Sequence, residues 1–262
     1  MHLRHCLLCV LAVSSLSACL RDDDPPGPGD TTDPTVLTFG EPMSFETNLE
    51  GLSAICLNEN GDGLLVAEDN GHIYEFGLEG ILLNGNAVSN PDNRAKVDLE
   101  GITLAPDGTI YVCEERFREV WRLGDDHTYI SLVSVGPQEA GAQDNQGYEG
   151  IAAGKDILYI ANQSSPKRVY TYSLTTGDWA TAFDADWATS LSDIYYDNDD
   201  GTLWITDAKT KKLTQLKTDG TVLHTYDISF VKKPEGFCMD KAHKRFWFVC
   251  DQTSRLVTVT YQ

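Results

Sequence analysis

The stretch Leu99-Glu100-Gly101-Ile102, followed after a turn by Ile110-Tyr111-Val112-Cys113-Glu114, contains the pattern that decides the fold. An acid and a glycine begin one apolar strand, and a second apolar strand ends in an acid or amide. The pattern begins at Glu50-Gly51, Glu100-Gly101, Glu149-Gly150, Ser192-Asp193 and Glu235-Gly236. These starts lie 50, 49, 43 and 43 residues apart. Because each unit contains only strands and turns, the period indicates β-propeller blades rather than a helical solenoid.

The two ends of the chain predict how the ring closes. The fifth unit has strands at residues 235–240, 245–250 and 256–261 and then ends one strand short. The segment Thr35-Val36-Leu37-Thr38-Phe39 resembles the fourth strand of unit four, Thr221-Val222-Leu223-His224-Thr225-Tyr226. We therefore expect an all-β, five-bladed propeller over residues 35–262, whose last blade is closed by the N-terminal strand and has no open edge.

The first 34 residues have the features of an export and anchoring segment. Arg4 precedes a short apolar run, and Leu16-Ser17-Ala18-Cys19 matches the lipobox of bacterial lipoproteins. We expect a signal peptide at residues 1–18, lipid on Cys19 and a disordered, acidic, Pro-rich tether up to residue 34. These features predict a bacterial outer membrane lipoprotein, either periplasmic or exposed at the surface.

Charge and cysteine content restrict the partners. The chain has 40 acids and 20 bases, a formal charge of −20, which argues against nucleic acid and anionic lipid surfaces. We expect a monomer that contacts the membrane only through its lipid and binds an unknown small molecule or protein. Cys56, Cys113, Cys238 and Cys250 lie in apolar strands, which favours free buried thiols over disulfides.

Polar residues at the strand ends predict two rings at one mouth of the channel, because the start of one antiparallel strand lies beside the end of the next. Ring one contains Glu50, Glu100, Glu149, Ser192 and Glu235. Ring two contains Glu68, Glu114, Asn162, Asp207 and Asp251. Crowded carboxylates favour a hard cation such as Ca²⁺, and we expect it at ring one. Basic residues at the third-strand starts, His72, Arg168, Lys212 and Arg255, offer ion pairs to ring two, which we interpret as mainly structural.

These strand starts carry a family resemblance. Val112-Cys113-Glu114-Glu115-Arg116, Tyr148-Glu149-Gly150-Ile151, Leu191-Ser192-Asp193-Ile194 and Pro234-Glu235-Gly236 resemble the SdiA-regulated (YjiK-like) family over nearly all of residues 45–262. The resemblance implies a five-bladed propeller, distantly similar to NHL repeats, with bound calcium and no established activity. By position, it implies ligands from Glu100, Glu149, Glu235 and Glu50. Asp193 departs from the family's glycine.

Two alternatives remain open in the sequence. Propellers of the gluconolactonase and paraoxonase type share this architecture, so a metal-dependent lactonase or esterase is the alternative to a non-catalytic binding module; Glu114 or Glu68 would be its base. The run Asn58-x-Asn60-x-Asp62-Gly63 has the spacing of an EF-hand loop, and Asp197-Asn198-Asp199-Asp200-Gly201 is similar. Both lie between strands, and we interpret them as hairpin turns.

Overall fold

Five four-stranded antiparallel sheets make up the part of the chain described by the computed structural model, residues 36–88, 97–138 and 146–262. Blades one and two contain β2 (Leu52–Leu57), β3 (Gly63–Glu68), β4 (His72–Gly77) and β5 (Leu82–Ala87), then β6 (Leu99–Leu104), β7 (Ile110–Glu114), β8 (Glu119–Leu123) and β9 (Tyr129–Val135). Blades three and four contain β10 (Tyr148–Ala153), β11 (Ile157–Asn162), β12 (Arg168–Ser173) and β13 (Trp179–Asp184), then β14 (Leu191–Asp197), β15 (Thr202–Asp207), β16 (Lys212–Leu216) and β17 (Val222–Asp227). Blade five contains β18 (Pro234–Asp240), β19 (Arg245–Cys250), β20 (Arg255–Thr260) and β1 (Met43–Glu46).

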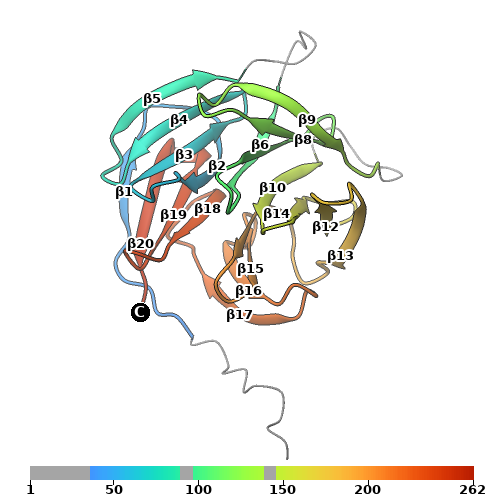
Figure 1. The fold of residues 1–262 in the computed structure, drawn as a ribbon. Coiled ribbons are helices and arrows are strands. Elements are labelled where there is room, and N and C mark those ends of the chain that lie inside the picture. Colours follow the sequence, from blue (N-terminus) through green and yellow to red (C-terminus); the bar gives the residue numbers. More distant parts are fainter. Residues whose placement is uncertain (1–35, 89–96, 139–145) are drawn as a thin grey trace, which may run out of the picture. The chain divides into compact units, whose positions relative to one another are not determined.

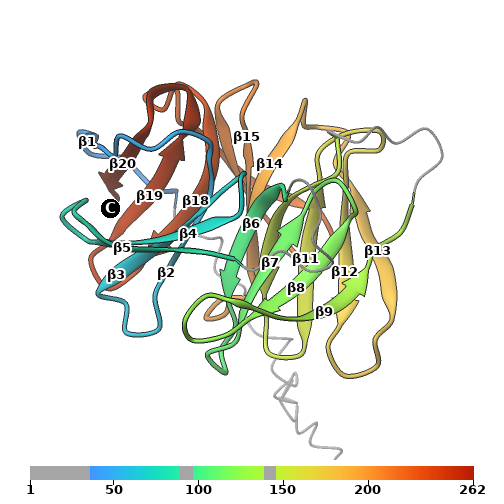
Figure 2. The same cartoon turned by 90° about the horizontal axis from the view of Figure 1, so that it is seen from above.

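The innermost strands form a closed ring. Strand β2 contacts β6 and β18, β10 contacts β6 and β14, and β14 contacts β18. Figure 1 shows the five sheets around this common centre, and in Figure 2 the strands of each sheet run between the two faces of the ring. The predicted five-bladed propeller is therefore confirmed.

The N-terminal strand closes blade five, as predicted, but its position differs. The segment expected as a strand at residues 35–39 forms a bridge between Phe39 and Tyr261, where Thr38 and Gln262 exchange two backbone hydrogen bonds at 3.0 Å, and the longer strand that pairs with β20 is β1, at Met43–Glu46. Phe39 also packs in an aromatic cluster, with its ring centroid 5.7 Å from that of Phe246. The segment before β1 thus pairs with the end of the chain, since Gly40 N–H also donates to Thr260 O at 2.9 Å, and its half-buried Leu37 and Phe39 pack against the core cluster of blade five.

Apolar side chains fill the spaces between neighbouring blades. One cluster joins Trp121 of blade two to Ala67 of blade one, and another joins Trp204 of blade four to Phe246 of blade five. Each blade is therefore buried on both faces. The four cysteines predicted to be free thiols are free and buried.

Small residues let the innermost strands approach one another near the axis. A Cβ atom placed on Gly150 would lie 2.7 Å from Cα of Asp193, and one on Gly236 would lie 2.6 Å from Cα of Ala54. Such distances exclude a side chain at these positions, which explains the recurring glycine after the glutamate. Asp193 is the exception. Its buried carboxylate accepts hydrogen bonds from the backbone N–H groups of Ile194 and Phe237, each at 2.8 Å.

Among the described residues, no helix is both long enough and apolar enough to cross a membrane.

Candidate metal centre

A bulge in each innermost strand turns one side chain toward the channel. The register of β6 with β7 pairs Leu99 with Glu114 and then Gly101 with Cys113, so Glu100 is left without a partner. The same irregularity recurs in all five blades. An unpaired bulge residue is a common way to aim a side chain at a site. The five residues, here named the bulge ring, are Ser53, Glu100, Glu149, Ser192 and Glu235.

The register corrects the alignment of the first repeat. Leu52 pairs with Glu68 as Leu99 pairs with Glu114, so the residue equivalent to Glu100 is Ser53 and not Glu50. Glu50 is exposed in the turn before β2, where the N–H of Gly51 donates to Asp251 Oδ1 at 3.1 Å. Gly51 has φ +67°, a turn conformation that the innermost strands do not adopt. Thus Glu-Gly at this place is a turn and not a strand start.

A second ring comes from the residues that directly follow the second strand of each blade. Backbone hydrogen bonds tie three of them to the residues that precede the innermost strands. Asp69 N–H donates to Gly51 O at 2.9 Å, and Gln163 N–H donates to Gly147 O at 2.8 Å. Glu115 N–H likewise donates to the carbonyl of Asp98 at 2.9 Å. This set, here named the turn ring, is Asp69, Glu115, Gln163, Ala208 and Asp251.

Both rings line one cavity of about 320 Å³ at a mouth of the channel. Its lining carries the carboxylates of Asp69, Glu100, Glu115, Glu149, Glu235 and Asp251. Among the described residues, two basic side chains, those of Lys209 and Lys233, line it. Glu100, Glu149 and Glu235, which the sequence placed at the channel mouth, therefore lie in one acidic cavity together with turn-ring acids that the sequence reasoning missed.

The densest group of carboxylates lies at blade two. Asp98, Glu100 and Glu115 each place one oxygen within 4.8 Å of the others. Asp98 and Glu115 are buried, and Arg116 Nε lies 2.7 Å from Asp98 Oδ2 on one side of the group. Such a set of hard oxygen donors is suited to a divalent cation, although acidic groups of this kind also occur without one.

Burial and mutual repulsion raise the pKa values of this group. The pKa of Glu100 lies well above its usual range because the carboxyl is buried and faces Glu115 and Asp98. The pKa of Glu149 is also well above its usual range, through burial and the nearby Glu100, and its carboxyl is hydrogen-bonded to that of Glu115. Without a cation, the folded protein holds protons here that glutamates in water would release.

In blade five, a lysine ammonium already pairs with the acids of the cavity. Lys233 Nζ lies 2.5 Å from Glu235 Oε1 and 3.1 Å from Asp251 Oδ2. Burial lowers the pKa of this ammonium, but its bonds to Glu235 and then Asp251 outweigh that effect and raise it. Blade five thus compensates its own acids with a lysine, whereas in blade two Arg116 pairs with Asp98.

Most ring-two residues of the sequence analysis cap turns or pair within the protein. Glu68 accepts from His72 Nδ1 at 2.7 Å, Glu114 accepts from the N–H of Phe117 at 2.8 Å, and Asp207 accepts from the N–H of Thr189 at 2.6 Å. Asn162 donates to Ser164 O at 3.1 Å and accepts from buried Arg118. In blade five the equivalent position is Cys250, so Asp251 belongs to the turn ring instead.

Of the basic partners proposed for ring two, only His72 pairs as expected. Lys212 Nζ lies 2.7 Å from Asp227 Oδ2, and Arg168 binds Asp184. Arg255 lies near Glu46, with 3.7 Å between Nη2 and Oε2. These cations pair with acids of the outermost strands. Each of β12, β16 and β20 lies between the second strand of its blade and the outermost strand, and the acid partner comes from the outermost one.

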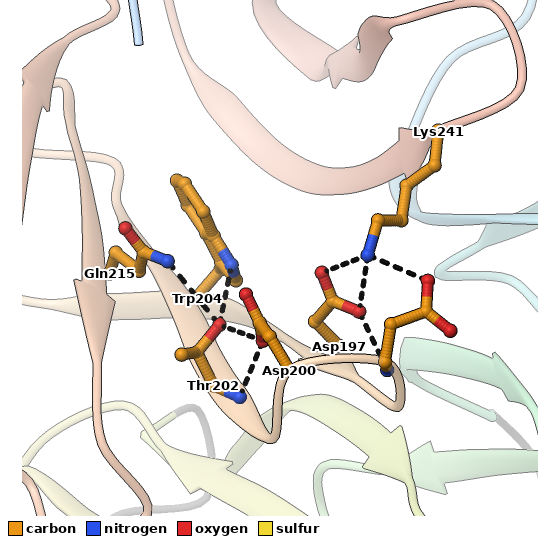
Figure 3. Close-up of polar contacts among 7 residues, drawn as sticks. Asp197, Asp200, Thr202, Trp204, Gln215 and Lys241 are labelled. Carbon is orange, nitrogen blue, oxygen red and sulfur yellow. Dashed lines mark hydrogen bonds and ion pairs between the residues drawn. The ribbon is translucent and has the colours of Figure 1, made fainter. Parts of the chain in front are cut away.

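The two calcium-like runs are hairpin turns, as predicted. Asn58 Oδ1 accepts the N–H groups of Asp62 and Gly63, each at 3.1 Å. In the other turn, shown in Figure 3, Lys241 Nζ lies 2.7 Å from both Asp197 Oδ2 and Asp199 Oδ2. The acids of this second turn are thus satisfied by protein groups.

The sequence contained a signal for the missed acids. Glu115 directly follows Glu114 at the strand end, and Asp69 follows Glu68 in the same way. Because neighbouring residues on a strand face opposite sides, only one of each pair can enter the channel. Choosing between them requires the register, which a single repeat unit does not reveal.

Family models match both halves of the chain. A phytase-like model, described as esterase-like activity of phytase, matches residues 47–206, which is more than half of the chain. The chain therefore belongs to this phytase-like family. A second model, described as SdiA-regulated, matches residues 184–262, which confirms the resemblance inferred from the strand starts.

Solved structures share the fold at low identity. A virginiamycin B lyase from Staphylococcus aureus with quinupristin has a TM-score of 0.50 at 16% identity, covering 82% of each chain. A nidogen/laminin complex matches with a TM-score of 0.57 at 13% identity, covering 80% of this chain and 75% of the other. A luciferin-regenerating enzyme matches with a TM-score of 0.53 at 14% identity, covering 80% and 77%. These likenesses establish the propeller fold alone. No curated protein is similar enough in sequence to count as a relative.

Proposed function

We propose that this protein binds calcium in the acidic cavity and acts as a lipid-anchored binding or scaffold module of the bacterial envelope. The observation that carries the proposal is the group formed by Asp98, Glu100 and Glu115, whose oxygens lie within 4.8 Å of one another. Close carboxylates repel one another by about 1 kcal/mol or more per pair at intermediate dielectric, and a divalent ion converts this repulsion into attraction.

A further atom supports a cation here. Within the described residues, Asp69 Oδ1 is buried and has no hydrogen-bond partner, and Asp69 lines the same cavity. Burial, and then the charge of Asp98, raises the pKa of this carboxyl. A buried, unpaired carboxylate oxygen is costly unless a bound ion or water satisfies it.

The donors favour calcium over softer metals. The polar lining contains carboxylates, serines, lysines and Gln163, and in the part of the chain that the structure describes no histidine or cysteine lines the cavity. Calcium accepts six to eight oxygen ligands in flexible geometry, whereas magnesium demands a near-ideal octahedron and gives up its water molecules reluctantly. Asp98, Glu100 and Glu115 would hold the ion, with Glu149 beside them.

The anchoring part of the proposal rests on the lipobox. Cys19 would carry the lipid, with residues 20–34 as the tether, and both lie outside the described residues. The excess of acids supports a role without nucleic acid, in which the lipid is the membrane contact of a monomer.

The second candidate is a metal-dependent esterase or lactonase. The phytase-like family match favours it, since that family is described by an esterase-like activity. The cavity also has room for a small substrate beside the acids, and Glu149, hydrogen-bonded to Glu115, is placed to hold a proton. A bound metal ion would supply Lewis-acid polarisation of the substrate oxygen.

Calorimetric titration of chelated protein with calcium tests the proposal. We expect binding that Glu100→Gln and Glu115→Gln each weaken by about tenfold or more, because each removes a ligand charge. Glu50→Gln is the matched control and should bind as the wild type does, because Glu50 is exposed outside the cavity. Absence of calcium binding to the wild type would overturn the metal assignment.

An ester and lactone panel separates the two candidates. Under the binding proposal, calcium-loaded protein turns over none of these substrates. Turnover that Glu149→Gln abolishes and Glu50→Gln retains would replace the binding module with the esterase.

A further inference from the structure

A second cavity, of about 160 Å³, lies at the other end of the channel. The acidic cavity is lined by the starts of the innermost strands, such as Ser53 of β2 and Glu100 of β6. The second cavity is lined by later residues of all five strands, such as Ile55 and Ile102. Because each residue advances a strand by about 3.3 Å, these later residues lie toward the far mouth. The second cavity is here named the opposite pocket.

A narrow level of the channel separates the two cavities. The residue after each bulge lines neither cavity, and these five residues are Ala54, Gly101, Gly150, Asp193 and Gly236. The neighbouring backbones crowd one another at this level, and the buried carboxylate of Asp193 is held there by the N–H groups of Ile194 and Phe237. The opposite pocket is therefore distinct from the proposed calcium site and shares no lining residue with it.

The wall of the opposite pocket is uncharged. In the part of the chain that the structure describes, no Asp, Glu, Lys, Arg or His lines it, although the whole chain has a formal charge of −20. Burial raises the pKa values of Cys56, Cys238 and Tyr195, so these side chains stay neutral at ordinary pH. A charged ligand would lose its hydration here without gaining an ion pair, and the pocket therefore selects a neutral one.

Aromatic and sulfur-containing side chains in the wall favour an aromatic ring. The ring centroids of Tyr195 and Phe237 lie 6.2 Å apart, and Tyr196 packs against Tyr159 at 5.1 Å. These contacts hold the rings of the wall in place. Three sulfur-containing side chains also line the pocket, those of Cys56, Cys238 and Met239. Aromatic rings bind favourably to other rings at such distances and to sulfur at the ring edge.

The volume of the pocket matches one ring. An apolar protein cavity of about 150 Å³ stays dry and binds benzene, and the opposite pocket has about the same volume. Its entrance is open to a ligand, because Leu57, Thr103 and Leu104 line it and are only half-buried. Water inside would find few hydrogen-bond partners among the apolar side chains, so its displacement costs little.

We propose that the opposite pocket binds a neutral small molecule with a single aromatic ring, such as a phenol. The proposal goes beyond the metal centre and does not depend on it, because a closed level of the channel separates the two cavities. It gives the propeller a second ligand, whose chemistry is set by an apolar wall.

An NMR titration of the isoleucine methyl groups with phenol tests the proposal. We expect saturable shifts of the four isoleucines that line the pocket, Ile55, Ile102, Ile151 and Ile194. The dissociation constant should be about 1 mM or below, as burial of one ring's apolar surface provides. Exposed Ile81, outside the pocket, is the internal control and should not shift. The same dissociation constant is expected in chelator and with calcium.

Two further compounds define the class of ligand. Cyclohexanol has the size and hydroxyl group of phenol but no π system, and it should bind about threefold more weakly or worse. Benzoate has the ring and a charge, and it should give no saturable shift.

A pair of variants locates the site. Thr103→Leu places a larger side chain in the pocket and should weaken phenol binding about fivefold or more. Thr225→Leu, at an exposed position of β17 outside the pocket, is the matched control and should bind phenol as the wild type does. Melting temperatures establish that both variants are folded, and the titration of the wild type decides the question if Thr103→Leu is not.

The outcomes separate this inference from the calcium proposal. Phenol that leaves the four methyl groups unshifted, or that shifts Ile81 as much, overturns the opposite pocket as a site. Binding of cyclohexanol or benzoate as tight as that of phenol, or undiminished binding to folded Thr103→Leu, also overturns the proposal. None of these results bears on the metal centre, and absence of calcium binding would leave the opposite pocket standing.

Discussion

At the residue scale, the positions that matter are the bulges at the starts of the innermost strands. A glutamate there is turned out of the ladder and into the cavity, as Glu100 and Glu149 are. A serine at the same bulge is hydrogen-bonded within the fold: Ser192 Oγ donates to Pro234 O at 3.0 Å, and Ser53 Oγ donates to Gly51 O at 3.2 Å. The ring is therefore chemically uneven, with its acids on blades two, three and five.

The raised pKa values predict how stability depends on pH. Without calcium, the folded protein binds protons at Glu100 and Glu149 more tightly than the unfolded chain does, because burial raises both pKa values above the ordinary 4.5. The stabilisation is complete below that value and is lost as pH rises through the folded pKa values. We expect the melting temperature of chelated protein to fall as the pH rises above the ordinary pKa of glutamate.

Calcium should remove this decline, because the ion binds the deprotonated carboxylates. Differential scanning calorimetry over this pH range, once with chelator and once with calcium, measures the melting temperature in both conditions. A melting temperature that rises with pH in chelator would contradict the repelling carboxylates. Glu50→Gln, outside the cavity, should leave both arms unchanged.

At the element scale, hairpin turns couple neighbouring blades away from the cavity. Lys241, in the turn between β18 and β19, reaches the carboxylates of Asp197 and Asp199 in the turn between β14 and β15 (Figure 3). Asp197 is 3% exposed and depends on this ammonium for charge compensation. The contact therefore joins blade five to blade four.

Lys241→Met should therefore lower the free energy of unfolding by about 2 kcal/mol, less than for a fully buried pair because the lysine side chain is 39% exposed. Urea denaturation measures the loss. Lys155→Met is the matched control, because Lys155 lies in the corresponding turn of blade three and has no ion-pair partner among the described residues. Adding Asp197→Asn to Lys241→Met should restore part of the stability; a further loss would argue against a charge effect.

At the scale of the whole molecule, the ring is closed by strands from its two ends. Strand β1 pairs with β20 from Met43↔Thr258 to Glu46↔Arg255, so the outer edge of blade five depends on residues far from it in sequence. Removing β1 would expose β20 as an unpaired edge.

Deleting residues 35–45 should consequently give an insoluble or aggregated product, while deleting residues 20–34 should leave the protein soluble and monodisperse. Soluble yield and size-exclusion chromatography of the two truncations provide the comparison. Equal behaviour of both truncations would show that the closure is dispensable.

The anchor belongs to the same scale. Changing Cys19 to Ser should abolish lipid labelling and release the protein from membranes, because the lipid on Cys19 is the proposed membrane contact. Fractionation after a high-salt wash checks this. A serine variant that stays with the membrane would indicate another attachment.

The sequence by itself determined the number of blades, the closure from the N-terminal side and the placement of Glu100, Glu149 and Glu235 at one mouth. These features follow from short patterns repeated five times, and repetition makes a weak local signal specific. The Glu-Gly pairs of β6, β10 and β18 were informative because a Cβ atom at Gly101, Gly150 or Gly236 would clash with the backbone of the neighbouring innermost strand.

Only the tertiary structure decided which of two adjacent residues faces the cavity. It replaced Glu50 with Ser53, added Asp69 and Glu115, and showed that the strand pairing with β20 is β1 at Met43–Glu46, with a short bridge at the segment predicted. The physical reason is register: a shift of one residue along a strand exchanges its two faces, and the pairing partner that fixes the shift lies in another part of the chain. The pattern of a repeat locates a ring of strands, whereas hydrogen bonding between the strands selects the atoms that meet inside it.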